Sequence, residues 1–139
     1  MMLPIKRLTR TATTPTKANE SDAGFDLYAD ENIILKTGET SLVSTGVSMA
    51  IPVGNVGLIW DRSSMGVKGI HRFAGVIDSG YRGEVKVCLH NASKDDYRIE
   101  CGNRIAQILI QSITQIELKE VTDLDNTERG GEGFGSSGK

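Results

Sequence analysis

The sequence lacks long apolar runs, and it lacks an excess of charge of either sign. No stretch approaches the ~18 consecutive apolar residues of a membrane-spanning helix. The opening Met-Met-Leu-Pro-Ile-Lys has no apolar centre of the kind that signal peptides carry. The formal net charge of -2 gives no general attraction to nucleic acid or to anionic membranes. We therefore expect a soluble, cytoplasmic protein that binds neither nucleic acid nor membranes.

Cysteine and histidine are scarce, which argues against metal centres and disulfide frameworks. The two cysteines, Cys88 and Cys101, do not have the spacing of a metal site, and a chain of 139 residues does not need a disulfide. Both lie in strand-like stretches, so we expect buried, inert thiols. The two histidines, His71 and His90, have no third ligand at a metal spacing, and no Ser/His/Asp or Cys/His pattern marks a nucleophile.

Short β-forming segments separated by turn signals make up most of the sequence. Val, Ile and Thr dominate these segments, and turns recur about every eight to twelve residues. The pattern predicts one all-β domain, an antiparallel sandwich or barrel of jelly-roll type. A single short helix is expected near 63–67, where Gly66 argues against greater length. The predicted strands are 3–8, 25–28, 33–35, 42–51, 56–60, 75–77, 84–89, 97–99 and 105–116.

Residues 75–87 carry the most informative pattern. Apolar residues lead into Asp78, a Ser-Gly turn signal follows, and the stretch after it alternates polar and apolar residues. This predicts a β-hairpin with Asp78 at the end of its first strand and Tyr81 just past the tip. An apolar wall, exposed peptide groups, one carboxylate and one aromatic face suit a small planar ligand beside a reacting centre. The alternative is a surface hairpin that merely tolerates an acid.

Hydrogen-bond donors gather beside two other predicted turns. Arg62, Ser63 and Ser64 follow a predicted strand, where a guanidinium and two hydroxyls can hold phosphate oxygens. Gln107 lies on the more polar phase of a buried strand, where its amide can face a ligand or a subunit interface. Each segment alone is also typical of a solvated loop. Together they favour binding of a nucleotide's polyphosphate, with Asp78 as a candidate general base.

The composition changes near the end of the sequence. Acidic residues follow Thr122, and residues 130–138 then contain five glycines in nine positions, which cannot build a packed core. The plain interpretation is a flexible tail. Such a tail needs neither Phe134 nor Arg129, so order on binding is the other possibility. Residues 133–139 fit the phosphate-loop pattern G-x-x-x-x-G-K without the helix that follows it in nucleoside triphosphatases, so only the phosphate-binding chemistry is expected.

Taken together, five segments resemble the motifs of the trimeric dUTPase (dUTP diphosphatase) family, in the family's order. They are 22–28 (DAGFDLY), 57–64 (GLIWDRSS), 75–83 (GVIDSGYRG), 102–107 (GNRIAQ) and 129–138 (RGGEGFGSSG). The resemblance implies a distorted jelly-roll β-barrel with one short helix. It further implies a homotrimer with three active sites, each assembled from all three subunits. A barrel domain, 1–125, would carry a flexible C-terminal arm, 126–139, that closes over an active site of a neighbouring subunit.

By this resemblance the activity is hydrolysis of dUTP to dUMP and pyrophosphate, which keeps uracil out of DNA and supplies dUMP for thymidylate synthesis. Asp78 would activate the water that attacks the α-phosphorus, or bind the 3′-hydroxyl. Mg2+ would be held chiefly by the three phosphates, with Asp26 reaching it at most through water. The residues implied for base and sugar are Gly75, Val76, Ile77, Tyr81, Lys86 and Phe134. Those implied for the phosphates are Arg62, Ser63, Ser64, Gln107, Arg129, Gly135, Ser136 and Ser137.

Three positions depart from the family's pattern. Ser64 stands where glycine is usual, and Asn103 stands where aspartate is usual, which weakens any charge-dependent role there. Arg72 lies six residues before Asp78, where many members carry an asparagine whose amide contacts the base. An arginine there would pair with Asp61, lie across the pocket mouth, or mark a subfamily that reads the base by backbone alone.

Two other functions share this fold: a related dCTP deaminase, and a regulatory or protein-binding trimer that has lost catalysis. The complete arm motif and Tyr81 argue against the deaminase. The presence of Asp78 and Arg129 argues against a loss of catalysis. If the source is a virus or a phage, the expected compartment is the cytoplasm of the host cell.

Overall fold

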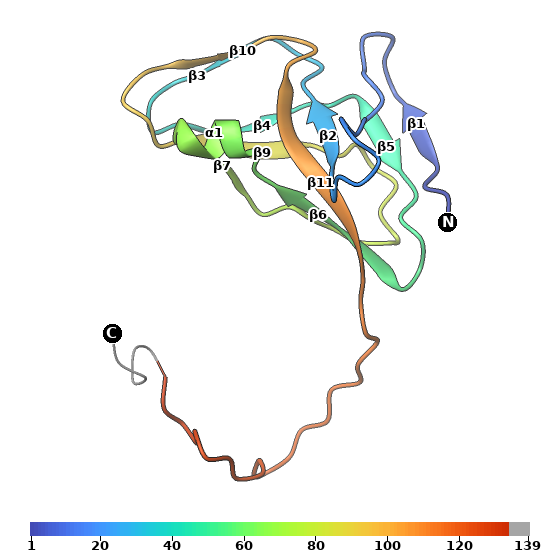
Figure 1. The fold of residues 1–139 in the computed structure, drawn as a ribbon, viewed down its shortest axis with the longest axis vertical. Helices are drawn as coiled ribbons and strands as arrows, with labels where there is room; N and C mark the ends of the chain where they lie inside the picture. The colour runs from blue at the N-terminus through green and yellow to red at the C-terminus, as the bar shows by residue number, and fades with distance from the viewer. Residues whose placement is uncertain (134–139) are drawn as a thin grey trace.

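A computed structural model describes residues 1–133, which have an all-β architecture with one short helix, α1 (Ser63–Val67). Figure 1 shows the strands gathered into one body, from which residues 113–133 extend. The predicted all-β class is confirmed. The strands are β1 (Ile5–Arg7), β2 (Phe25–Tyr28), β3 (Ile33–Leu35), β4 (Thr40–Val43), β5 (Val47–Met49), β6 (Asn55–Trp60), β7 (Ile70–Phe73), β8 (Val76–Ile77), β9 (Val87–Asn91), β10 (Tyr97–Ile99) and β11 (Arg104–Ser112).

Two antiparallel sheets supply most of the core. One has the strand order β2-β11-β6-β8 and the other β4-β9-β7, while β1-β5 and β10-β3 form two-stranded pairs. Most neighbouring strands are distant in sequence, as in jelly rolls, whose strands pair across long connections. Side chains from both sheets form one apolar cluster, which includes Leu27, Val43, Val87, Leu89 and Ile108.

Strand β9 shows the alternation that makes such a core. Val87, Leu89 and Asn91 are buried, whereas Cys88 and His90 are half-buried on the opposite face. Asn91 is the polar member of the buried face, and its Nδ2 donates to two backbone carbonyls at 2.8 Å each. The buried amide is therefore satisfied, and it connects β9 to β3 and to the loop that follows β9.

Strand β11 is paired on both sides. Gln107 lies opposite Asp26 of β2 and opposite Trp60 of β6. Directly paired residues share a face, so these three side chains lie on one surface of the four-stranded sheet. Ile108, the next residue, is fully buried on the other face.

Several predicted strands coincide with the observed ones, but three regions differ. The predicted strand 42–51 is two strands, β4 and β5, because Gly46 (φ 66) turns the chain between them. The predicted strand 105–116 ends at Ser112, as β11. Strand β7 has no counterpart among the predicted strands.

The predicted hairpin at 75–87 is wrong. Its first arm, β8, pairs with β6, whereas its second arm leads into β9, which pairs with β4 and β7. The tip is a turn, because the Tyr81 N–H donates to the Asp78 carbonyl (3.1 Å). The Val85 N–H then donates to the Val47 carbonyl (2.8 Å), which draws the chain to other strands. Local alternation cannot reveal such a partner, since strand pairing is set by distant residues.

The buried-thiol prediction is wrong for Cys101. Cys101 is exposed, in the turn between β10 and β11 where Gly102 has a φ of 87°. Cys88 is half-buried in β9, and both thiols are free.

After β11 the chain leaves the barrel, and residues 113–133 contain neither strand nor helix (Figure 1). Three apolar side chains in this stretch, Ile116, Leu118 and Leu124, are 75%, 97% and 85% exposed. Within residues 1–133, no helix has the length and apolar character to cross a membrane.

Candidate active site

A cavity of about 330 Å³ opens beside β8 and brings together most residues predicted for the base and sugar. The segment from the end of β7 through β8 forms one wall, and residues of β4, β9 and the turn before β9 form the other. We call this cavity the β8 pocket; its lining residues are Leu42, Phe73, Ala74, Gly75, Val76, Ile77, Asp78, Tyr81, Glu84, Lys86 and Cys88. Among the predicted base and sugar contacts, Phe134 lies outside the described residues.

The wall of the β8 pocket depends on a turn between β7 and β8. Ala74 has a φ of 56° and Gly75 a φ of 107°, both in the left-handed region that favours glycine. The Gly75 carbonyl accepts a hydrogen bond from the Ile59 N–H (2.8 Å). A Cβ at Gly75 would lie 3.1 Å from both the Ile59 carbonyl oxygen and the Ile59 Cβ, so a side chain there would strain the wall.

Asp78 and Tyr81 lie at the two ends of the turn that follows β8. Tyr81 Oη donates to the Glu84 carbonyl (2.9 Å), which holds the ring against the backbone. A Cβ at Gly83 would overlap that ring, so glycine is needed there. Asp78 is exposed, and its carboxylate takes part in no ion pair within residues 1–133.

Lys86 reaches the same pocket from the opposite wall. Its Nζ lies 3.6 Å from Glu84 Oε2, while Glu84 Oε1 accepts the Gly46 N–H (2.9 Å). Glu84 is thus tied to the backbone and holds the ammonium group of Lys86 at the pocket. One cation and one free carboxylate, Asp78, therefore face the same cavity.

A second cavity, of about 360 Å³, collects the residues predicted for the phosphates. It lies where β2 and β11 meet the start of α1. We call it the β11 pocket; its lining residues are Ala18, Asp22, Asp26, Arg62, Ser63, Ser64, Arg104 and Gln107. Four residues predicted to bind the phosphates therefore share one cavity with Asp26, the acid predicted to reach Mg2+ at most through water.

Ion pairs orient the cations of the β11 pocket. Arg62 Nε donates to Asp26 Oδ1 (2.9 Å), and Arg62 Nη1 lies 3.5 Å from Ser64 Oγ. Arg104 Nη1 is 3.5 Å from Asp26 Oδ2. Asp26 therefore holds two guanidiniums side by side, an arrangement suited to a ligand that carries several anionic oxygens.

The amide of Gln107 is fixed from two directions. Its Nε2 donates to the Asp61 carbonyl (2.9 Å), one residue before Arg62. Gly24 makes room for its Oε1, because a Cβ at Gly24 would lie only 2.6 Å from that oxygen. The orientation of this amide is therefore set by the packing of β2 against β11.

The two pockets are separate on one chain. They share no lining residue, and Ile77 of the β8 pocket pairs with Gly57, three residues along β6 from Trp60. Three strand spacings of about 4.8 Å and three residues of about 3.4 Å each separate Asp26 from Ile77, so their Cα atoms are roughly 18 Å apart. Strand alternation also directs these two side chains to opposite faces of the sheet. One chain thus carries the residues predicted for the base and sugar and those predicted for the phosphates in two separate cavities.

Arg104 is a pocket residue that sequence reasoning missed. Two-residue alternation from Gln107 places residue 105 on the pocket face and residue 104 in the core. A register shift between Arg104 and Ala106 reverses this order, and Ile105 and Ala106 are both buried. A bulge changes the direction of the side chain before it, so no simple period in the sequence could predict that Arg104 faces the pocket.

Phe73 and Leu42 of the β8 pocket were missed because they come from strands of the other sheet.

The Arg72 side chain neither pairs with Asp61 nor lines the β8 pocket within the described residues. Its backbone N–H donates to Asp61 Oδ1 (2.8 Å), while the other Asp61 oxygen pairs with His71 Nδ1. The guanidinium lies over the Trp60 ring, 4.6 Å from its centroid, and Nη1 donates to the Ala74 carbonyl (2.9 Å). Arg72 does not line the β8 pocket.

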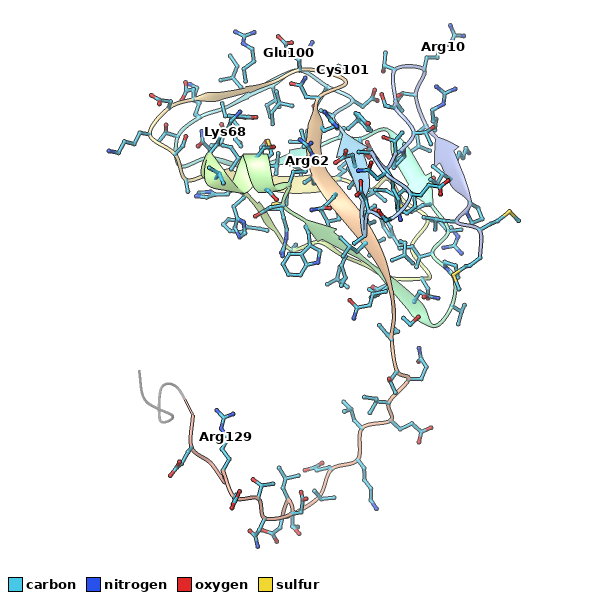
Figure 2. The ribbon with its side chains drawn as sticks, in the orientation of Figure 1. Arg10, Arg62, Lys68, Glu100, Cys101 and Arg129 are labelled. Atoms are coloured by element: carbon cyan, nitrogen blue, oxygen red, sulfur yellow. The ribbon has the colours of Figure 1, made fainter. Side chains whose placement is uncertain are left out.

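Arg129 lies on the extended segment, away from Arg62 and the β11 pocket (Figure 2). Its Nε donates to the Glu132 carbonyl (2.9 Å), and the Gly130 N–H donates to the Thr127 carbonyl (3.1 Å). A local turn therefore orients this side chain, and Arg129 lines neither the β8 pocket nor the β11 pocket of its own chain. The other predicted arm contacts, Gly135, Ser136 and Ser137, lie outside the described residues.

Comparisons with known proteins point to one family. The family model described as dUTPase matches residues 10–138. The deoxyuridine 5'-triphosphate nucleotidohydrolase of Nocardia farcinica is 44% identical over 98% of this chain and 85% of its own length. The structure of the Staphylococcus bacteriophage 80alpha dUTPase with dUPNHPP has a TM-score of 0.94 at 32% identity, covering 99% of each chain. A mutant dUTPase from phage phi11 of S. aureus, whose structure shows the coordination of a structural Mg(II) ion, has a TM-score of 0.85 at 26% identity, covering 91% of this chain and 100% of that one. This chain therefore belongs to the dUTPase family.

Proposed function

We propose that this chain hydrolyses dUTP to dUMP and pyrophosphate, as a homotrimer whose active sites are shared between subunits. The observation that carries the proposal is the division of the dUTPase motifs of one chain between two separate pockets. The β8 pocket contains the base and sugar motif, and the β11 pocket contains the phosphate motifs. A neighbouring copy must then supply the complementary half of each site.

Strand β8 supplies the edge that reads the base. It is the last strand in the order β2-β11-β6-β8, so its outer peptide groups pair with no strand of residues 1–133. These peptide groups, from Gly75 to Ile77, bond the edge of uracil. Cytosine reverses a donor and an acceptor on that edge, which leaves buried groups unpaired and makes the mismatch costly.

Tyr81 and Phe134 hold the nucleoside from two sides. The Tyr81 ring, fixed by its bond to the Glu84 carbonyl, packs beneath the deoxyribose and excludes a 2′-hydroxyl. Phe134, from the arm of another subunit, stacks on the uracil. Lys86 completes the sugar side of the β8 pocket.

Asp78 is the catalytic base in this proposal. Its carboxylate lies at the exposed rim of the β8 pocket and is not neutralised by an ion pair within the described chain. It can accept a proton from the water that attacks the α-phosphorus. Binding of the 3′-hydroxyl is the other role open to this carboxylate.

The β11 pocket is electrically balanced without its ligand. Arg62 and Arg104 are opposed by Asp22 and Asp26, so a tetra-anionic triphosphate needs further positive charge. Mg2+ and Arg129 from another subunit supply that charge. The proposed phosphate contacts are Arg62, Ser63, Ser64 and Gln107 from the barrel, with Arg129, Gly135, Ser136 and Ser137 from the arm.

Magnesium fits this pocket when the substrate provides most of its ligands. No group of three His, Cys, Asp or Glu side chains in the described part of the chain is placed to hold a metal. The Asp26 oxygens are engaged by Arg62 and Arg104, so Asp26 reaches the ion at most through water. Mg2+ keeps several waters and is commonly held by one or two carboxylates plus substrate phosphates. When bound, the ion neutralises phosphate charge and orients the triphosphate.

The arm, residues 126–139, closes the site in a neighbouring subunit. The stretch that precedes it is extended and exposes Ile116, Leu118 and Leu124, apolar side chains suited to packing on another copy of the chain. Closure excludes water and fixes the in-line geometry, from which most phosphoryl-transfer catalysis arises. The barrel, residues 1–125, folds without the arm.

The test is release of pyrophosphate from dUTP and from dCTP by the purified full-length chain with Mg2+, with light scattering to measure assembly. We expect a trimer whose kcat/KM for dUTP exceeds that for dCTP by about 10⁴-fold or more. Asp78→Asn should stay trimeric and lose about 10²- to 10⁴-fold in kcat. A monomer, or intact dUTP, contradicts the proposal. Formation of a uracil nucleotide from dCTP would assign the chain to the deaminases, and full turnover by Asp78→Asn would remove Asp78 from its role.

A further inference from the structure

Arg72 occupies an inward-facing position of β7. It lies opposite the buried Leu89 of β9, and the residue two before it, Ile70, is fully buried on the same face. The Nε atom of Arg72 is buried and has no hydrogen-bond partner in residues 1–133. Because a buried unpaired donor costs stability, an apolar side chain of similar length would suit this position better for folding alone.

Two contacts hold the Arg72 guanidinium at the edge of the core. It stacks on the half-exposed ring of Trp60, and its Nη1 donates to the Ala74 carbonyl (2.9 Å). A planar guanidinium can stack on an indole and still use the N–H groups at its edge. Arg72 therefore connects the end of β6 to the turn between β7 and β8.

That turn is the strained part of the β8 pocket. Ala74 is the non-glycine residue with a positive φ in the described chain, and the φ of Gly75, which follows it, is positive as well. Both residues line the β8 pocket, and β8 begins at the next residue, Val76. A change in the turn would rotate the first peptide groups of β8, which face the base in the proposed function.

We propose that Arg72 is a positioning residue for base recognition, which fixes the Ala74–Gly75 turn while stacked on Trp60. The inference rests on the proposed function, because it assigns the β8 pocket to uracil. Arg72 acts through the turn, since it is not a lining residue. In this proposal Arg72 orders the backbone that reads the base and does not itself contact the base.

The test compares Arg72→Met and Trp60→Ala with the control Arg98→Met. Arg98 is exposed on β10 and lies outside both the β8 and β11 pockets. In Arg72→Met and Trp60→Ala we expect kcat/KM for dUTP to fall about 10-fold and the preference for dUTP over dCTP to fall by a similar factor. The midpoint of urea unfolding of Arg72→Met should not fall, because methionine fills the inward position without an unpaired donor.

Trp60 provides a readout that does not depend on turnover. It is the single tryptophan of the sequence, so the emission spectrum reports directly on the stacked pair. We expect this spectrum to change in Arg72→Met and to stay unchanged in Arg98→Met. Hydrogen–deuterium exchange of residues 73–78 should be faster in Arg72→Met, since the Ala74 carbonyl loses its donor.

The outcomes separate this inference from the proposed function. Unchanged dUTP preference in folded Arg72→Met or Trp60→Ala would overturn it, as would an equal loss for both nucleotides together with lower stability. If Arg72→Met does not fold, Trp60→Ala decides, because Trp60 is half-exposed and adds little to the core. If the wild type cleaves no dUTP, the proposed function fails, and unchanged exchange of 73–78 in the variants would then overturn the positioning role.

Discussion

Replacing Gly24 with alanine should weaken catalysis without altering any residue that contacts substrate. A Cβ at Gly24 would lie 2.6 Å from Gln107 Oε1, and 3.2 Å from both Gln107 Cβ and Leu109 Cδ1. Ordinary contact begins near 3.4 Å, so the amide oxygen must retreat by about 0.8 Å. The Gln107 amide lines the β11 pocket, where the phosphates are proposed to bind.

The size of the effect follows from that movement. The bond from Gln107 Nε2 to the Asp61 carbonyl (2.9 Å) is disturbed, and a hydrogen bond of this kind contributes about 1 kcal/mol to stability. Displacement of a positioning group by about 1 Å can cost ~100-fold in rate. We therefore expect kcat/KM for dUTP to fall about 10- to 100-fold, and the free energy of unfolding to fall by about 1 kcal/mol.

The assay is steady-state pyrophosphate release, with urea unfolding as the measure of stability. Gly66→Ala is the matched control, because the atoms nearest its Cβ lie 3.9 and 4.0 Å away, both in Asp61. It should keep full activity. In a Gln107→Ala background, Gly24→Ala should cost little more, since the two changes act through one amide. Wild-type kcat/KM in Gly24→Ala, or the same loss with Gln107 already removed, would refute the reasoning.

Three further predictions address the sugar, the arm and the core. Tyr81→Phe should loosen the ring by removing its bond to the Glu84 carbonyl; we expect weaker discrimination against UTP, measured as the dUTP-to-UTP ratio of kcat/KM, and an unchanged ratio would contradict the role of the ring. Deletion from Arg129 onward should leave a folded trimer that turns over poorly, because the arm is a lid, and dissociation of the trimer in light scattering would speak against this. Asn91→Ala should lower the free energy of unfolding by about 3 kcal/mol, since it leaves two backbone carbonyls without their donor; a urea midpoint within error of wild type would count against it.

The chemistry of the candidate site could be predicted from the sequence because each motif is local. Arg62, Ser63 and Ser64 are consecutive, and Asp78 and Tyr81 close one turn, so short-range geometry keeps each group together. The helix at 63–67 coincides with its prediction for the same reason. Alternation of Val, Ile and polar residues determined the all-β class, since a period of two places one face of each strand in the core.

Only the tertiary structure decided which segments meet and where two arginines point. Strand β8 joins β6 and not its neighbour in sequence, because pairing depends on surfaces that distant strands provide. Arg104 faces the β11 pocket because a bulge shifts its strand by one residue. Arg72 reaches Trp60 because folding brings the end of β6 beside β7. Such contacts join residues that no local period relates, so they exist only once both sheets have assembled.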